Sequence, residues 1–374
     1  MMKTNFKKQF IAGLLAISSL TGFGSSIEAA GTSYNPDIEL SFCGQTLVNV
    51  PSALTHQLSS LALSSNDNLM QDWVQIESKQ KSLTLETVLC AERSVSCYES
   101  SANTITSDVA KAVGNAAGFS ASNYELDTKF GNVNGIPAGN VSVYNNNGKK
   151  ILIVSFHGTA CTDDGITDAY ATKTKCDFLG NHSAHTGFVK RYMLVRDDLM
   201  QTLKVLSRCQ YNFSEILITG HSLGGALATL CTLDLANRIN KNEFGKEWYN
   251  KFGSHLLEKS NLYSITLCSP RVLSKNAAKY AENLIPESTG NIMRLWRNGD
   301  AVPAVGTGWM GFKHFGRSCM VTHKYSTLAA HSSVNMLKDV INFATTPNAF
   351  KQGIAKDTKG AARKSWFRSL FGRN

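Results

Sequence analysis

The sequence predicts an α/β fold, with helices on both faces of a central, mostly parallel sheet. Three observations lead to this prediction. Residues 214–236 begin with an apolar, β-branched run and continue, after a glycine, into small residues and good helix formers, which is typical of a strand, a tight turn and a helix. The run at 150–156 is apolar at nearly every position, as expected for a strand covered on both faces. Two later apolar runs, 262–268 and 292–296, are expected to add further strands.

The segments around these strands supply the rest of the fold. Residues 141–144 and 150–156 are expected to pair as a hairpin, because a run of Asn residues and a Gly separates them. Helices are expected at 53–63, at 106–117, at 189–206 and from His331 to Phe343.

The pattern Gly-x-Ser-x-Gly occupies residues 220–224. Between a strand and a helix, this pattern predicts a nucleophile elbow, a strained turn that holds a reactive serine above the edge of the sheet. Glycine is expected at both positions for a steric reason, since a side chain at either one would collide where strand and helix approach each other. Ser222 is therefore the predicted nucleophile. The alternative is a glycine-rich connection in which the serine is incidental.

A serine nucleophile needs a base within hydrogen-bond reach, and the base needs a carboxylate to orient it. In α/β-hydrolases these residues follow in the chain order Ser, acid, His. Asp300 directly follows the strand expected at 292–296 and is the predicted acid, with a simple turn-forming role as its alternative. The other carboxylates considered after Ser222 are Asp234, Glu243, Glu282 and Glu287.

Histidines at 314, 323 and 331 follow Asp300. His331 stands just before the last expected helix and is the predicted base, while His314, in a loop rich in glycine and aromatic residues, is held in reserve. His221 lies inside the elbow, but its side chain is expected to point away from Ser222 as a core or turn residue.

These motifs resemble the fungal-type, or class 3, triacylglycerol lipase family of the α/β-hydrolase superfamily. The residues that carry the resemblance are 156–159, Asp164 with Asp168, 185–188, 220–225, 269–272, 298–303 and His331 with Ser332. The resemblance covers roughly residues 140 to 345, and it departs from the family at His157, where an Arg is usual. It implies Ser222, Asp300 and His331 as the triad. It also implies an oxyanion hole made by the backbone N–H groups of Thr159 and Leu223, with the Thr159 hydroxyl as a third donor.

Composition divides the chain into four parts. Residues 1–30 combine lysines with an apolar run too short to span a bilayer and predict a signal peptide, so the protein is expected to be secreted or periplasmic. Residues 31–135 are interpreted as a helical or irregular cover, and residues 136–345 as the hydrolase core. The formal net charge of +10 is concentrated in the tail, 346–374, whose aromatic and basic residues favour an amphipathic helix on an anionic membrane surface. A solvated basic terminus is the alternative.

Nine cysteines in an exported chain favour some disulfides. The predicted bridges join Cys90 to Cys97 and Cys161 to Cys176, while Cys231 and Cys268 are expected to be free thiols packed in the core.

The predicted function is therefore that of an exported serine carboxylester hydrolase that cleaves acylglycerol or phospholipid esters through an acyl-enzyme on Ser222. The alternative is a binding or effector protein that keeps a hydrolase scaffold without the chemistry. No cofactor, no metal and no nucleic acid are expected. Asp177, His182 and His185 do not have the spacing of a strong metal template.

Overall fold

The computed structural model describes seventeen stretches of the chain. They are residues 41–42, 45–46, 73–74, 84–97, 102–113, 118–133, 136–158, 172–208, 213–241, 261–286, 291–297, 300, 302–304, 306, 310–321, 330–345 and 354–355. The predicted signal peptide, the helix expected at 53–63, Thr159 and Cys161 lie outside these residues, as does the tail apart from residues 354 and 355.

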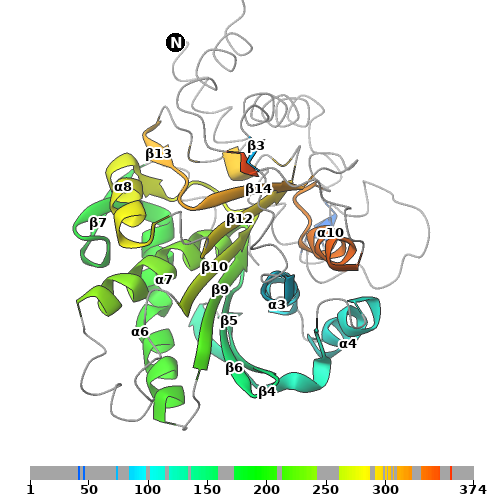
Figure 1. Cartoon of the computed structure of the whole chain (residues 1–374). Helices are drawn as coiled ribbons and strands as arrows, with labels where there is room; N and C mark the ends of the chain where they lie inside the picture. Colours follow the sequence, from blue (N-terminus) through cyan, green and yellow to red (C-terminus); the bar gives the residue numbers. More distant parts are fainter. Residues whose placement is uncertain are drawn as a thin grey trace, which may run out of the picture.

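A nine-stranded sheet forms the centre of the molecule (Figure 1). Its strands, in spatial order, are β3 (Trp73–Val74), β15 (Ile354–Ala355), β14 (Arg317–Val321), β12 (Ile292–Arg297), β10 (Leu262–Leu267), β9 (Phe213–His221), β6 (Lys149–Phe156), β5 (Ile136–Asn146) and β4 (Tyr124–Val133). The neighbouring pairs from β6 to β14 are all parallel, and the strands outside them pair antiparallel. The five strands at the centre of the sheet are thus parallel to one another, as predicted, and antiparallel pairs flank them on both sides.

Helices cover both faces of this sheet (Figure 1). On one face lie α3 (Thr84–Ser96), α4 (Ala102–Val113) and α10 (Ser333–Thr345), and on the other lie α6 (Thr186–Arg208), α7 (Leu223–Asn240) and α8 (Lys275–Leu284). Successive side chains of a strand point to opposite faces, so β6 serves both layers. Leu152 and Val154 pack in the core with α7, and Ile151 and Ile153 pack in the core with α3.

The predicted hairpin is present as β5 and β6. Asn146 pairs with Lys149 across a two-residue turn. Asn147 and Gly148 in that turn have φ angles of 52° and 86°. A type I′ turn needs positive φ at both central residues, and Asn and Gly tolerate this best. Strand β5 begins at Ile136, earlier than the apolar run at 141–144 indicates.

The boundary expected between residues 135 and 136 falls inside a hairpin, in which Val133 pairs with Ile136. β4, on the N-terminal side of that boundary, pairs with β5 from Tyr124 to Val133 and is an edge strand of the sheet. Helix α3 also belongs to the core, since the hydroxyls of Ser94 and Thr219 lie 3.0 Å apart between α3 and β9. The described residues between 84 and 133 are therefore part of the same core as the main sheet. The helix expected at 106–117 is α4, which begins earlier.

A second sheet of four short strands lies beside the main one. Its order is β13 (Phe312–Lys313), β11 (Leu273–Ser274), β8 (His182–His185) and β7 (Lys173–Cys176). All of its pairs are antiparallel. The apolar pattern did not indicate these strands because each has only two to four residues.

The two predicted disulfides are wrong, because Cys90, Cys97 and Cys176 are free thiols. Cys90 lies within helix α3 and Cys97 directly follows it. Seven residues along a helix correspond to a rise of about 10 Å, which is beyond the reach of a disulfide. The Cys176 thiol donates to the Thr174 carbonyl. Cys231 and Cys268 are buried free thiols, as expected.

No helix in the described part of the chain combines the length and the apolar character that crossing a lipid bilayer requires.

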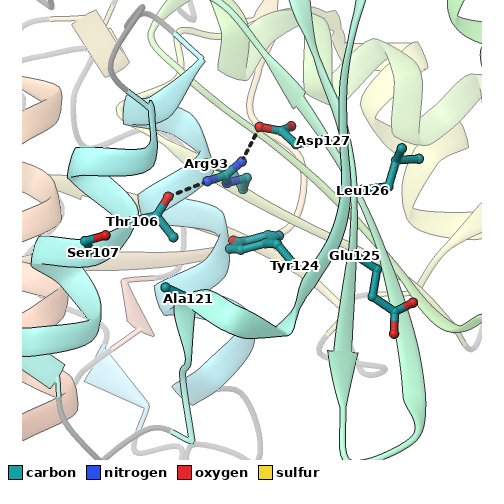
Figure 2. Close-up of a pocket in the computed structure, with 8 residues that line it drawn as sticks. All are labelled: Arg93, Thr106, Ser107, Ala121, Tyr124, Glu125, Leu126 and Asp127. Atoms are coloured by element: carbon teal, nitrogen blue, oxygen red, sulfur yellow. Dashed lines mark hydrogen bonds and ion pairs between the residues drawn. The ribbon is translucent and has the colours of Figure 1, made fainter.

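A pocket of about 320 Å³ opens between α3, α4 and β4 (Figure 2). It is lined by Arg93, Thr106, Ser107, Ala121, Tyr124, Glu125, Leu126 and Asp127. None of these lining residues belongs to the predicted triad. The pocket is therefore distinct from the site described below. Charged groups that pair with one another, Arg93 and Asp127 among them, border it.

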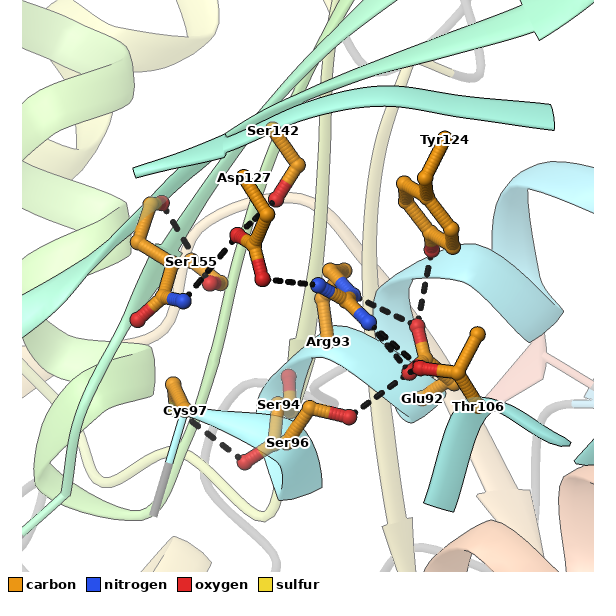
Figure 3. Close-up of polar contacts among 11 residues, drawn as sticks. Glu92, Arg93, Ser94, Ser96, Cys97, Thr106, Tyr124, Asp127, Ser142 and Ser155 are labelled. Carbon is orange, nitrogen blue, oxygen red and sulfur yellow. Dashed lines mark hydrogen bonds and ion pairs between the residues drawn. The ribbon is translucent and has the colours of Figure 1, made fainter. Parts of the chain in front are cut away.

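Arg93 is buried at the centre of a polar network on this side of the sheet (Figure 3). Its guanidinium donates to both oxygens of Glu92 at 2.6 Å, to Asp127 on β4 at 2.8 Å and to Thr106 on α4 at 2.8 Å. The Tyr124 hydroxyl donates to Glu92 at 2.7 Å. The network joins the edge strand β4 to α3 and α4, the two helices that lie on the face of the sheet opposite α7.

Candidate active site

Ser222 stands on the turn between β9 and α7, where its backbone has φ 59° and ψ −123°. Such a conformation is costly for a residue with a side chain and is found where structure and function hold it in place. A Cβ on Gly220 would lie 2.4 Å from the Gly224 carbonyl group, and one on Gly224 would lie 2.2 Å from the Phe156 oxygen. Strand β6, strand β9 and helix α7 therefore meet too closely for any other residue at either glycine.

The structure brings Ser222, His331 and Asp300 into one chain of hydrogen bonds. His331 Nε2 lies 2.9 Å from Ser222 Oγ, and His331 Nδ1 lies 2.9 Å from Asp300 Oδ2 and 3.1 Å from Oδ1. The three residues are 2%, 5% and 1% exposed in the order Ser222, His331, Asp300. With Nδ1–H donating to the carboxylate, Nε2 is the acceptor that faces the serine hydroxyl. This is the arrangement in which a histidine removes a proton from serine.

Asp300 is fully buried, and burial alone would raise its pKa, yet the pKa is lowered. The lowering comes from His331, from a hydrogen bond donated by the Cys268 thiol and from the Val302 backbone N–H, which lies 2.9 Å from Oδ1. Cys268 directly follows β10 and has a φ of 52°, an uncommon value for a residue other than glycine. The carboxylate is therefore held in its charged form next to the base.

Side chains from two other segments form hydrogen bonds with the loop after Asp300. His314 Nε2 donates to the Pro303 carbonyl at 2.9 Å, and Arg271 Nη1 donates to the Ala304 carbonyl at 2.9 Å. Burial lowers the pKa of His314 well below its ordinary value, so the ring is neutral. His314, the reserve base, thus orients the acid loop instead of facing the serine.

His331 lies two residues before α10, in a segment held by buried side chains. His221 Nε2 lies 2.8 Å from the His331 carbonyl oxygen and donates to it. Burial lowers the pKa of His221 to about 3, with the neighbouring His331 adding to the effect, so His221 remains neutral at ordinary pH. As expected, His221 does not act on Ser222 directly, but its role in orienting the base had no signal in the sequence beyond its place in the elbow. Arg297 and Cys268 were also not identified from the sequence.

The predicted oxyanion donors are only partly described. Leu223 opens α7, so its backbone N–H is among the first four of the helix, which have no carbonyl partner within it. A helix N-terminus also favours negative charge. Thr159 lies outside the described residues, but the chain is described up to Gly158, and His157 N donates to the Ala138 carbonyl at 2.8 Å. The close approach of Gly224 to Phe156 places the end of β6 against the elbow.

The remaining acidic and histidine candidates serve other contacts. Asp234 accepts hydrogen bonds from Tyr192 at 2.9 Å, from Arg196 at 2.6 Å and from Arg238 at 2.9 Å on the α6 and α7 side of the sheet. His185 stacks on Phe188 with ring centroids 4.5 Å apart. Glu243 and Glu287 lie outside the described residues, and Glu282 lies on α8.

Within the described ranges, one group of three side chains has potential metal-ligating atoms within 4.8 Å of one another, namely His221, Cys268 and His331. Both ring nitrogens of His331 are already hydrogen-bonded to Asp300 and Ser222. A metal ion bound by this histidine would have to displace one of these contacts. The geometry instead suits a serine hydroxyl that attacks an electrophilic carbonyl.

Comparison with known proteins agrees with the family resemblance of the sequence motifs. Residues 153–308 match the family model described as Lipase (class 3). The secreted mono- and diacylglycerol lipase A of Penicillium cyclopium is 27% identical over 206 residues, which are 55% of this chain and 59% of that protein. A lipase of Rhizomucor miehei is 30% identical over 184 residues, which are 49% of this chain and 45% of that protein. The chain thus spans about half the length of the curated relatives it matches.

Among solved structures, the lipase from Rhizopus microsporus var. chinensis is similar to this chain with a TM-score of 0.47 and 21% sequence identity. The similar region covers 70% of this chain and 81% of that chain.

Proposed function

We propose that this chain, whose residues 153–308 match the family model described as Lipase (class 3), is a serine carboxylester hydrolase acting on acylglycerol esters. The observation that carries the proposal is the continuous hydrogen-bonded chain from Ser222 through His331 to Asp300, built on a strained elbow. An incidental serine in a glycine-rich turn would need neither the strain nor the buried base and acid behind it.

The proposed reaction passes through an acyl-enzyme. Ser222 Oγ attacks the ester carbonyl carbon while His331 Nε2 takes the hydroxyl proton, and Asp300 stabilises the resulting imidazolium. The tetrahedral intermediate collapses when His331 returns the proton to the departing alcohol oxygen. A water molecule then attacks the acyl group, again giving its proton to His331, and the fatty acid leaves as Ser222 is regenerated.

The negative oxygen of the intermediate is proposed to accept hydrogen bonds from the backbone N–H groups of Thr159 and Leu223, with the Thr159 hydroxyl as a third donor. The start of α7 supports the role of Leu223, because this N–H lies one residue after the nucleophile. Loss of one such donor raises the barrier of related reactions by about 3 kcal/mol.

The proposal is tested by measuring fatty-acid release from emulsified mono-, di- and triacylglycerols. We expect release by the wild-type protein and none by Ser222→Ala purified alongside. The alternative, a binding or effector protein on a hydrolase scaffold, predicts equal background from both proteins. It also predicts that a fluorophosphonate, which labels activated serines, does not label the wild-type protein at Ser222.

Phospholipids are the second proposed substrate class, because of the composition of the tail. Residues 356–374 interleave Trp366 and Phe367 with basic residues such as Lys364 and Arg368. Such a segment can bind anionic lipid by combining charge attraction with insertion of apolar rings. The protein is also proposed to be exported by the signal peptide at residues 1–30.

A shortened chain tests the tail. The cut should follow Ala355, because β15 pairs with β14 and β3 and the sheet would lose a strand if the chain ended earlier. We expect the shortened chain to lose binding to vesicles that contain anionic phospholipid, and to keep its rate on neutral acylglycerol emulsions. Full binding and full activity of the shortened chain on anionic vesicles would remove any role for the tail.

A further inference from the structure

Arg297 is the last residue of β12, and its side chain is fully buried. Its guanidinium pairs with the carboxylate of Asp339 on α10, with Nε and Nη2 each 2.7 Å from Oδ2. Nη1 donates to two backbone carbonyls, those of Ala330 at 3.3 Å and Ser332 at 3.2 Å. One side chain thus joins the end of a central strand to the segment that carries the predicted base.

The two carbonyls that Arg297 binds belong to the residues on either side of His331. Ser332 is fixed further, because its carbonyl accepts from Met336 N at 3.0 Å and its hydroxyl accepts from Asn335 N at 3.3 Å, which caps α10. The backbone on both sides of His331 is therefore bound to the guanidinium, and the helix that follows is bound to it through Asp339.

The same residue also contacts the acid. The Arg297 carbonyl accepts a hydrogen bond from the Asp300 backbone N–H at 3.2 Å. Asp300 and His331 come from separate segments, and their side chains must meet within 3 Å to form the triad. Arg297 binds the first segment through its backbone and the second through its side chain.

We propose that Arg297 is a positioning residue that sets the placement of His331 relative to Asp300 and Ser222. This inference rests on the proposed hydrolase function. It explains why a full charge is buried here, although an apolar residue would avoid the cost of desolvation. Only a planar guanidinium can bind one carboxylate and two carbonyls at once, since its five N–H donors have a fixed, forked geometry. A lysine ammonium keeps the charge but cannot make the same set of contacts.

The decisive variant is Arg297→Lys in the full chain. We expect kcat for ester hydrolysis to fall by about 10-fold to 100-fold, because a displacement of about 1 Å in a catalytic group has an effect of this size. KM should stay within about twofold, because the residue does not face the substrate. The rate should be expressed per active site, titrated with a fluorophosphonate, so that unfolded molecules do not contribute to the loss.

The matched control is Arg196→Lys. Arg196 on α6 makes a similar double contact with a buried carboxylate on α7, 2.6 Å and 3.0 Å from the two oxygens of Asp234. We expect this variant to lower the melting temperature while keeping kcat per site within about twofold, because no backbone next to the triad depends on it.

Asp339→Asn keeps the inference testable if Arg297→Lys does not fold. The Asp339 side chain is 20% exposed and the substitution preserves its shape, so the guanidinium loses its anchoring charge but remains in the chain. We expect a smaller loss of kcat per site in this variant, also without a change in KM. Wild-type kcat per site in a folded Arg297→Lys or Asp339→Asn variant would overturn the inference, as would an equal loss in Arg196→Lys. An inactive wild-type protein would contradict the proposed function instead.

Discussion

Replacing Ser222 with alanine is expected to lower kcat for ester hydrolysis by about 10⁴-fold or more, because the nucleophile of a serine triad cannot be replaced by its base and acid alone. The substitution removes only the hydroxyl that lies 2.9 Å from His331 Nε2. It leaves the elbow glycines and the His331 to Asp300 contact in place. KM should change little, and labelling by a fluorophosphonate should disappear.

A buried serine in the same sheet provides the control for this experiment. Ser264 in the middle of β10 is 1% exposed and has no contact with the triad that the structure describes. Ser264→Ala should keep kcat within a few-fold of the wild type. If Ser222→Ala kept a tenth of the wild-type kcat with the same substrate, the serine would not be the nucleophile and the mechanism would have to be rebuilt on another residue.

Replacing Arg93 with methionine is expected to lower the free energy of unfolding by about 3–5 kcal/mol, the usual effect of removing one partner from a buried ion pair. Burial alone would lower the pKa of Arg93, but Tyr124 and Glu92 raise it, so the guanidinium is charged in the folded protein. Without it, the fully buried Glu92 carboxylate keeps hydrogen bonds from Ser96, Thr106 and Tyr124 but has no cation beside it. The polar contacts among α3, α4 and β4 would be weakened together (Figure 3).

The loss should be measured by denaturant unfolding, with the midpoint and the slope compared between variants. Lys111→Met on α4 is the control, since Lys111 and its partner Asp108 are 80% and 68% exposed and lie 3.6 Å apart. An exposed ion pair of this kind contributes less than about 1 kcal/mol. If Arg93→Met unfolded at the wild-type denaturant concentration, the network would be a consequence of the packing of α3 and not a cause of it.

The three residues of the proposed triad could be selected from the sequence because each has a local signal, and the structure brings their side chains into hydrogen-bond contact. The glycines around Ser222 reflect a steric requirement between residues that are neighbours in the chain, and the structure shows the short approaches that impose it. Asp300 follows an apolar strand, and His331 stands before the last helix. The order of these segments along the chain then suggested which side chains meet at the carboxyl ends of the parallel strands.

Helix α3, at Thr84–Ser96, was not expected from the sequence. Its residues include Glu92, Arg93, Ser94 and Ser96, all buried although they are polar or charged. A search for apolar periodicity interprets such a segment as exposed, because the partners that satisfy these groups come from β4, α4 and β9. The predicted bridge between Cys90 and Cys97 is wrong because a helix at these residues was not expected, and the helix holds the two thiols too far apart.

The sequence by itself determined the order of strands and helices around the elbow, the predicted nucleophile and the candidate acid and base, because these depend on contacts between residues close in the chain. Only the tertiary structure decided how these residues are held. Arg297 binds the carbonyls on both sides of His331, although 33 and 35 residues of chain separate it from the residues that carry them. His221 and Cys268 complete the surroundings of the triad from two other strands. Such long-range contacts form because parallel strands place their carboxyl ends side by side, whatever the length of chain between them.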